Sequence, residues 1–366
     1  MTIGIDARIW GHPGMGRYLR EVFFAMRRQA PEVRFQLLMY QSERQELDRM
    51  DAGIAIHPAK SPIYSLSEQW ELSAFSKRKE LLHVPHFNIP LLSGAKKLVV
   101  TVYDLIYLKD TVHSGSWLGR AYVNFMFKAV EKKADVVIVV SEYTKMDLLN
   151  YFPKLRGRVF VIPAAVSSLF YPITSDSVLQ EARKRHGLNR PFVLFVGSLK
   201  PHKNVSLLVE AMADLRREKK IDAELVLVGR KDEKDKKLLG LMQKYASFIR
   251  RFETLPDEQL LYLYNLAEVF VLPSFWEGFG LPALEAMACG TPTLLSNRAS
   301  LPEVGGQAAL YFDPTSVDAL KEGLCNVLQN EDVCQKMRVD GLLQAKEFSW
   351  DKTAVQTLKI YEQVLR

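Results

Sequence analysis

The sequence has few cysteines, the residues that disulfide-rich secreted proteins and most zinc sites need. Its 366 residues include three cysteines, Cys289, Cys325 and Cys334. This odd and sparse set excludes a disulfide framework, and no Cys/His cluster has the spacing of a zinc site. We therefore expect buried structural thiols in a reducing cytoplasm.

Long apolar runs are also missing. The longest, such as residues 136–140, cover five residues, whereas a membrane-spanning helix needs about 18 to 20 apolar residues. The first residues have no basic stretch followed by an apolar one, so no signal peptide is predicted. We expect a cytoplasmic protein that is soluble or lies peripherally on the inner face of the plasma membrane.

Excess positive charge is confined to the first half of the chain. The formal net charge is +7, and residues 1–170 contain 23 Lys and Arg against 16 Asp and Glu, whereas residues 171–366 contain 26 of each kind. A basic half can bind anionic lipid, nucleic acid or a phosphate-bearing substrate, or it can be only a solvated surface. No stacking-platform motif is visible, so nucleic acid is not an expected partner.

Short apolar runs alternate with amphipathic segments along the whole chain. Near-continuous apolar strands are typical of a parallel sheet that is covered on both faces. The alternation predicts an α/β protein with two doubly wound domains. Strands are expected at residues 2–7, 35–40, 98–103, 135–140, 192–197, 224–229, 269–273 and 293–296, and helices from residue 17, at 205–215 and 257–267, from about residue 282, and at 350–365. The stretch 164–177 contains two prolines and several serines and interrupts this rhythm, which places the domain boundary there.

The strongest motif is PSFWEGFGLPALEAMACGTP at residues 273–292. A loop with Gly278 and Gly280 follows a strand, and a helix begins near Pro282. Amides at a helix N-terminus attract phosphate, and glycines let a ligand come close. Glu277 and Glu285 lie eight residues apart. An ionised carboxylate only accepts hydrogen bonds, so this pair suits the hydroxyls of a sugar and a ribose.

This segment resembles the Glu-x7-Glu signature of glycosyltransferase family 4, whose members have the GT-B fold. The resemblance covers nearly the whole chain, and the sequence is similar to bacterial mannosyltransferase-like members of the family. It implies two Rossmann-like domains facing a cleft: residues 1–168 for the acceptor, residues 169–349 for the nucleotide-sugar donor, and a last helix, 350–366, that packs back on the first domain. The other matching blocks, in the order of the family, are GMGR at 14–17, TVYD at 101–104, VSEY at 140–143, VIP at 161–163, VGSLKPHKN at 196–204, LVG at 227–229 and LPEV at 301–304.

The resemblance implies a role for each residue of the main motif. Glu277 would contact hydroxyls of the donor sugar, and Glu285 would bind the ribose of the nucleotide. The sugar and the phosphates would be held by the amides of Gly278, Phe279, Gly280 and Leu281.

Lys203 follows the strand 192–197 by a short loop, at the carboxyl end of the sheet where α/β proteins bind ligands. A lysine there can neutralise the charge that builds up on a leaving diphosphate. The family usually has Arg or a small hydroxyl residue after the glycine of this strand, and here Ser198 stands in that place. Ser198 can donate one hydrogen bond, and Lys200 and His202 are candidates for a missing cation.

Gly14 and Gly16 lie between the first strand and its helix. A dinucleotide fingerprint needs a third glycine where Leu19 stands, so the pair alone is a weak signal. The resemblance implies that this loop faces the cleft and touches the diphosphate. The alternative is a purely structural turn.

Tyr103 and Asp104 end the strand 98–103. Many relatives have His-Asp here, with the histidine near the donor sugar and the reaction centre. A phenol keeps a hydrogen-bond donor but does not change charge near neutral pH. His83 and His86 belong to another junction of strand and loop, and either could compensate. A structural or acceptor-side role is the alternative for both.

Segment 116–133 mixes aromatic and apolar residues with basic ones. Such a helix could lie at a membrane interface, or it could pack on the core with a solvated basic face. The aromatic and apolar residues are Trp117, Leu118, Tyr122, Phe125, Met126 and Phe127, and the basic ones are Arg120, Lys128, Lys132 and Lys133.

The resemblance implies a retaining hexosyltransferase, and the block at 196–204 is similar to branches that often use GDP-mannose. We therefore expect the protein to move mannose from GDP-mannose to a glycan or lipid-linked acceptor in cell-envelope or exopolysaccharide synthesis. No residue stands out as a covalent nucleophile, which favours front-face displacement. No Asp-x-Asp diad follows a strand, so we expect no metal, and the only co-substrate is the nucleotide-sugar. The alternatives are a UDP- or dTDP-sugar donor, a nucleotide-sugar epimerase, or a non-catalytic homologue that binds nucleotide or glycan.

Overall fold

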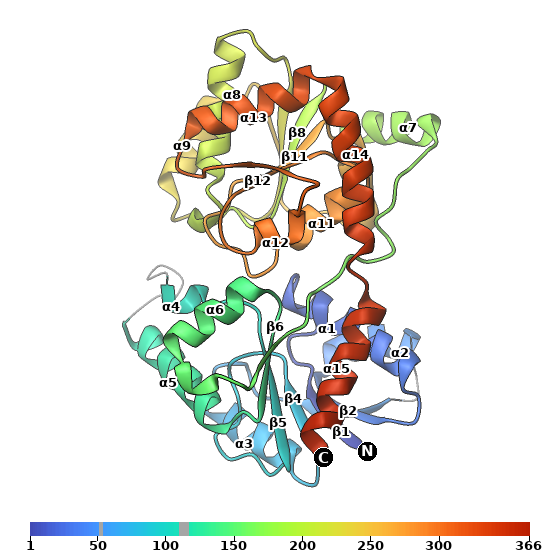
Figure 1. The fold of residues 1–366 in the computed structure, drawn as a ribbon, viewed down its shortest axis with the longest axis vertical. Helices are drawn as coiled ribbons and strands as arrows, with labels where there is room; N and C mark the ends of the chain where they lie inside the picture. Colours follow the sequence, from blue (N-terminus) through green and yellow to red (C-terminus); the bar gives the residue numbers. More distant parts are fainter. Residues whose placement is uncertain (51–53, 110–116) are drawn as a thin grey trace. The chain divides into compact units, whose positions relative to one another are not determined.

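The computed structural model describes residues 1–50, 54–109 and 117–366 (Figure 1). The described chain forms two compact units: Met1–Ala164 with Ser349–Arg366, and Ala165–Phe348. Each unit contains one parallel β-sheet with helices around it. The prediction of an α/β protein with two doubly wound, Rossmann-like domains is therefore confirmed. Among the residues described, no helix is long and apolar enough to cross a membrane.

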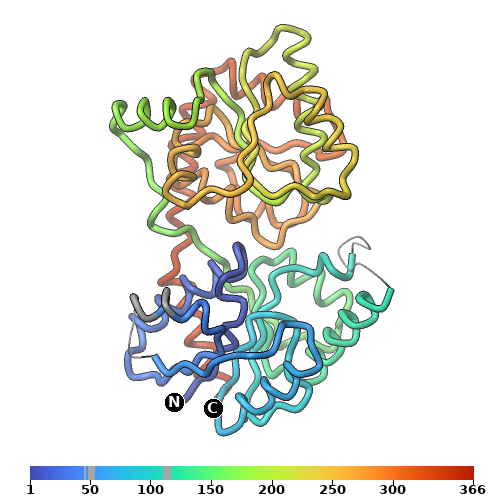
Figure 2. The backbone as a smooth tube through the Cα atoms, turned by 180° about the vertical axis from the view of Figure 1, so that it is seen from behind, coloured from blue at the N-terminus to red at the C-terminus, as the bar shows by residue number. Residues whose placement is uncertain are grey.

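The first unit contains both ends of the chain (Figure 2). Its strands are β1 Thr2–Asp6, β2 Arg34–Tyr40, β3 Ala55–Ala59, β4 Leu81–Val84, β5 Lys97–Val102, β6 Val136–Val139 and β7 Val159–Val161. Its helices are α1 Met15–Gln29, α2 Gln41–Met50, α3 Leu66–Ser76, α4 Ile106–Lys109, α5 Trp117–Lys133, α6 Glu142–Tyr151 and α15 Trp350–Leu365, with a 3₁₀ turn η1 at Pro153–Leu155. Ser116, the first residue of the segment singled out above, lies outside the described residues.

The strand order of the first sheet is β3-β2-β1-β4-β5-β6-β7, and every pair is parallel. From β1 the chain adds strands outward on one side, and it then returns to add β4 to β7 on the other side. The point where the winding reverses lies between β1 and β4. Ligands of doubly wound sheets bind outside the carboxyl ends of the strands at such a switch point.

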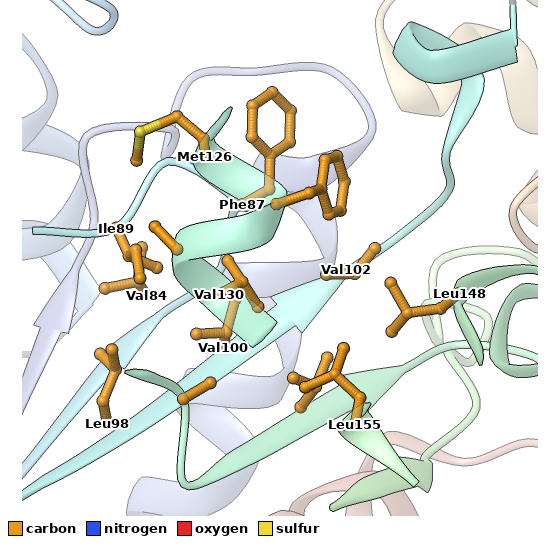
Figure 3. Close-up of a cluster of buried hydrophobic side chains, with 14 of the residues drawn as sticks. Val84, Phe87, Ile89, Leu98, Val100, Val102, Met126, Val130, Leu148 and Leu155 are labelled. Carbon is orange, nitrogen blue, oxygen red and sulfur yellow. The ribbon is translucent and has the colours of Figure 1, made fainter. Parts of the chain in front are cut away.

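Helix α5 packs on one face of this sheet (Figure 3). Successive side chains of a strand point to opposite faces, and Leu98, Val100 and Val102 of β5 share a buried apolar cluster with Met126 and Val130 of α5. The inner side of α5 therefore packs on the core. This agrees with the interpretation of segment 116–133 as a helix that packs on the core.

The intervening residues of β5 face the C-terminal helix instead. Thr101 Oγ1 lies 2.8 Å from His83 Nε2, and Tyr361 Oη of α15 lies 2.6 Å from His83 Nδ1. All three side chains are buried. His83 lies inside β4 rather than at its end, and both ring nitrogens are already engaged. The idea that His83 could replace a catalytic histidine is therefore wrong.

The buried His83 makes the stability of the first unit depend on pH. Burial lowers the pKa of His83 to about 3, while in the unfolded chain a histidine has a pKa of about 6.5. Between these values the unfolded state binds a proton that the folded state does not, so stability falls as the pH is lowered. We expect a loss of about 3 kcal/mol from this residue between about pH 7 and pH 4.5, measured by denaturant unfolding. His83→Gln should flatten this dependence by about one proton, and an unchanged slope would contradict the assignment.

The second unit repeats the same plan. Its strands are β8 Phe192–Val196, β9 Glu224–Val228, β10 Ile249–Phe252, β11 Val269–Leu272, β12 Thr293–Ser296 and β13 Leu310–Phe312. Its helices are α7 Asp176–His186, α8 Val205–Arg217, α9 Lys236–Lys244, α10 Asp257–Leu266, α11 Leu281–Ala288, α12 Leu301–Gly305, α13 Val317–Gln329 and α14 Glu331–Lys346, with a 3₁₀ turn η2 at Pro201–Lys203. The strand order is β10-β9-β8-β11-β12-β13, again all parallel. The switch point of this sheet lies between β8 and β11.

Candidate active site

An ion pair occupies the switch point of the second unit. Lys203 ends the turn η2 after β8, and Glu277 lies in the loop after β11, the neighbouring strand. Lys203 Nζ is 2.6 and 2.7 Å from the two carboxylate oxygens of Glu277, and the two side chains are 16% and 9% exposed. Ser274 Oγ donates a third hydrogen bond to Glu277 at 2.6 Å. The structure thus brings together two predicted site residues with opposite charges.

Ser300 holds the loop that carries Glu277 through two hydrogen bonds. This residue was not predicted from the sequence. Its buried hydroxyl donates to the carbonyl oxygens of Glu277 at 3.0 Å and of Phe279 at 2.9 Å. Gly280 has a φ of 109°, a backbone conformation that favours glycine, and a Cβ atom there would also push Leu301 Cδ2 aside at 2.8 Å. The sole sequence signal for Ser300 is its place directly before the block at 301–304.

Glu285 lies one turn inside α11 and is 3% exposed. Tyr264 Oη donates a hydrogen bond to one of its carboxylate oxygens at 2.8 Å, and Tyr264 itself is fully buried. Tyr264 was not singled out from the sequence, because an aromatic residue on a helix usually indicates core packing. It orients Glu285, whose contact with a ribose stays a prediction. Burial, with the nearby carboxylate, also raises the pKa of the Cys289 thiol, which stays protonated.

Ser198 lies in the loop between β8 and η2. This loop runs close to the loop after β9, because Leu199 N–H donates to the carbonyl of Arg230 at 2.9 Å. The carbonyl of His202 accepts a hydrogen bond from Phe275 N–H at 2.8 Å, which ties η2 to the segment before Glu277. Of the two candidates for an additional cation, His202 is buried and Lys200 is exposed.

The glycines of the first unit have different environments. A Cβ atom on Gly16 would lie 2.2 Å from the carbonyl oxygen of Trp10, so Gly16 allows helix α1 to pack closely against the preceding loop. Gly14 has no atom within 4 Å of the equivalent position. Gly16 is therefore required by the fold, whereas Gly14 leaves room at the start of α1.

Tyr103 directly follows β5. Its ring packs edge-on against Tyr18, with the ring centroids 5.2 Å apart. Its hydroxyl is buried and finds no hydrogen-bond partner among the described residues, and burial raises its pKa well above the ordinary value. The next residue, Asp104, accepts a hydrogen bond from Ile106 N–H at 2.9 Å and so helps begin α4. The Tyr103 phenol is therefore neutral, and its contact with a ligand stays a prediction.

Comparison with known proteins identifies the family of the chain. A family model described as Glycosyltransferase Family 4 matches residues 13–168, and one described as Glycosyl transferases group 1 matches residues 179–341. The chain is 32% identical over 319 residues to the O-antigen chain mannosyltransferase B of Escherichia coli, covering 86% of this chain and 80% of that protein. It is 31% identical over 291 residues to the serotype-specific mannosyltransferase WbdA of Escherichia coli, covering 77% of this chain but only 35% of that protein.

Solved structures show the same fold. Sucrose-phosphate synthase from Thermosynechococcus elongatus superposes with a TM-score of 0.79 at 23% identity, covering 99% of this chain and 98% of that one. HepE from Anabaena, in complex with UDP and glucose, superposes with a TM-score of 0.78 at 16% identity, covering 99% of each chain. With the family models and the relatives, these matches establish that the chain belongs to glycosyltransferase family 4 and has the GT-B type of fold.

Proposed function

We propose that this glycosyltransferase moves mannose from GDP-mannose to a glycan acceptor in cell-envelope polysaccharide synthesis, with retention of configuration and without a metal ion. The observation that carries the proposal is the Lys203–Glu277 pair at the switch point of a sheet in a family 4 chain. The choice of mannose is supported by the O-antigen chain mannosyltransferase that matches most of this chain.

Each side chain of the site suits one part of such a donor. The Lys203 ammonium would stabilise the diphosphate, together with the amides of Gly278, Phe279, Gly280 and Leu281 and the Ser198 hydroxyl. Glu277 would accept hydrogen bonds from hydroxyls of the sugar, and Glu285 from those of the ribose. The roles that the family resemblance implies for Gly14, Gly16, Tyr103 and Asp104 of the first unit stay predictions.

The reaction would proceed by front-face displacement. An acceptor hydroxyl oxygen bonds to the anomeric carbon on the side from which the nucleotide leaves, and the bond from that carbon to the phosphate oxygen breaks. The hydroxyl proton passes to the departing phosphate oxygen, so GDP leaves and the α-configuration is kept. Lys203 lowers the barrier by stabilising the charge that builds up on the diphosphate. The anomeric configuration of the product, measured by NMR, tests the proposed retention.

A nucleotide-binding experiment tests the proposal most directly. A ligand that binds only the folded state raises the unfolding midpoint by mass action. We expect GDP at about 1 mM, with EDTA present, to stabilise the protein, and UDP, dTDP, ADP and CMP to do so much less. A shift with UDP or dTDP alone would show that the donor is a UDP- or dTDP-sugar instead of GDP-mannose. Loss of transfer in EDTA would contradict metal independence. No shift with any nucleotide would favour a non-catalytic homologue.

Peripheral contact with anionic membranes is the second part of the proposal. The outward side of α5 carries Trp117, Leu118 and Phe125, which are 78%, 60% and 54% exposed, and the exposed Lys128 and Lys132 follow them. Aromatic and basic residues on one helix face suit the interface of an anionic bilayer. We expect Trp117→Ser with Phe125→Ser to reduce co-sedimentation with anionic vesicles at least several-fold. Val339→Ser, at an exposed apolar residue of the second unit, is the control, and equal sedimentation of all three proteins would contradict the contact.

A further inference from the structure

The switch point of the first unit carries a buried charged group that the proposed mechanism does not use. Arg8 follows β1, and its Nε and Nη2 donate to the two carboxylate oxygens of Asp6 at 2.8 and 2.7 Å. On its other side, Arg8 Nη1 lies 3.6 Å from Glu68 Oε2 of α3. Arg8 is 3% exposed, Asp6 6% and Glu68 0%. We name these three side chains the Arg8 cluster.

The Arg8 cluster joins the loops after β1 and β4 to two helices. Asn88, after β4, donates a hydrogen bond to Glu68, and Tyr122 of α5 donates one to Asn88. Arg8 Nη1 is buried but has no hydrogen-bond partner among the residues that the structure describes. A buried donor that pairs with a charge but makes no hydrogen bond is unfavourable. A water or a ligand that accepts this hydrogen bond would complete the polar network.

Tyr64 forms the exposed surface over this network. Its φ is 69°, a conformation that a bulky residue adopts only under constraint. The constraint comes from Glu68, whose carboxylate accepts a hydrogen bond from the Tyr64 N–H, and from His86 Nε2, which lies 3.1 Å from Tyr64 Oη. The ring also packs edge-on against Tyr122 and is nevertheless 49% exposed. The fold thus holds a large aromatic ring in strained geometry and open to solvent, at the carboxyl edge of the sheet.

The charged groups that contact this network are paired. Arg8 faces the two carboxyl groups of Asp6 and Glu68. Burial lowers the pKa of His86 to about 4, so its ring is neutral at physiological pH. Lys109, at the end of α4, is paired with Asp147 at 2.6 Å. A phosphate group would find no free cation among these groups, whereas a neutral polyhydroxyl ligand would meet hydrogen-bonding groups and an aromatic ring.

We infer that Tyr64 is a platform on which the terminal sugar of the acceptor stacks, and that this sugar is neutral and not phosphorylated. The inference rests on the proposed function, because it assigns the second substrate of the same reaction. The C–H face of a pyranose is apolar and packs on an aromatic ring, while its hydroxyls exchange hydrogen bonds with the tyrosine and histidine around it. The Arg8 cluster acts as a positioning group: through Glu68 it fixes the backbone of Tyr64.

The test of acceptor class uses the full-length protein saturated with GDP on an array of neutral and phosphorylated saccharides, with mannotriose, mannose 1-phosphate and inositol 3-phosphate as defined soluble probes. Binding confined to neutral saccharides is the expected result. Stronger binding of the phosphorylated probes, or no saccharide binding by a protein that does bind GDP, would overturn the inference. Failure of GDP to bind at all would instead count against the proposed function, so the two failures are distinguishable.

Substitution of the ring tests the platform. Tyr64→Ala should weaken binding of neutral saccharides by about five- to tenfold, because the sugar loses the stacked face of the ring. Tyr64→Phe, which keeps the ring, should retain most of the binding. Tyr151→Ala is the matched control, because Tyr151 is also 49% exposed and belongs to the same unit. GDP binding should be equal in all variants, and an unchanged circular dichroism spectrum and unfolding midpoint show that the first unit of each variant is folded. Equal saccharide binding by Tyr64→Ala and Tyr151→Ala would contradict the platform.

Discussion

Glu277→Gln should reduce sugar transfer by about a thousandfold while the protein binds GDP more tightly than the wild type does. The loss of transfer follows from the removal of a charged acceptor for sugar hydroxyls, and a charged hydrogen-bonding group in an active site commonly contributes about 3–4 kcal/mol. The gain in nucleotide affinity follows from the ion pair. Lys203 Nζ lies 2.6 Å from a Glu277 oxygen, so a diphosphate would compete with this carboxylate for the same cation.

The sign of the change in GDP affinity separates this mechanism from a general disturbance of the site. Glutamine keeps the shape of glutamate and can still accept the hydrogen bond from Ser274, but it no longer neutralises Lys203. A distorted loop would weaken both transfer and GDP binding. Calorimetric titration with GDP, and transfer rates with a saturating donor, measure the two quantities. Glu268→Gln is the control, because Glu268 directly precedes β11 at the opposite end from Glu277. It should change neither the transfer rate nor the GDP affinity. Full transfer activity in Glu277→Gln would refute the assignment of Glu277.

Both units and most of their central strands could be predicted from the sequence, because buried parallel strands are continuous apolar runs. The strand at 293–296 was predicted with its observed bounds, and several others end one residue earlier than expected. The strands that composition did not indicate include β3, β10 and β13. β3 is mostly exposed and contains Pro58, and β10 contains Arg250 and Arg251 and has no fully buried residue. All three lie at or next to the edge of a sheet, where an apolar run is not required.

The contacts among the candidate site residues could not be predicted from the sequence. Lys203 and Glu277 were given separate roles, and their pairing became visible only when β8 and β11 proved to be neighbours. The Arg8 cluster was missed altogether. Glu68 lies 60 residues from Arg8 in an ordinary helical segment, where an acidic residue usually means a solvated surface. Only the winding of the chain around β1 and β4 shows that this residue is buried.

Gly229→Ala should destabilise the second unit by more than about 4 kcal/mol, one of the largest effects that a single methyl group can have. Gly229 follows β9, and a Cβ atom there would lie 1.8 Å from the carbonyl oxygen of Gly197. The φ of Gly229, 156°, adds strain for any other residue. Since the obstacle is backbone and not a flexible side chain, the loop after β8 has to move away. That loop leads to Ser198 and Lys203, so nucleotide binding should be lost together with stability.

Gly240→Ala is a control with the opposite sign. Gly240 lies inside α9, and a Cβ atom there meets nothing within 4 Å. Alanine in a helix should therefore stabilise the protein by up to about 1 kcal/mol. Scanning calorimetry with and without GDP measures both effects. If Gly229→Ala unfolded within about 1 kcal/mol of the wild type, the close approach of the two loops would be wrong. If it were destabilised yet still bound GDP with wild-type affinity, the loop after β8 would not be what places Lys203 beside the nucleotide.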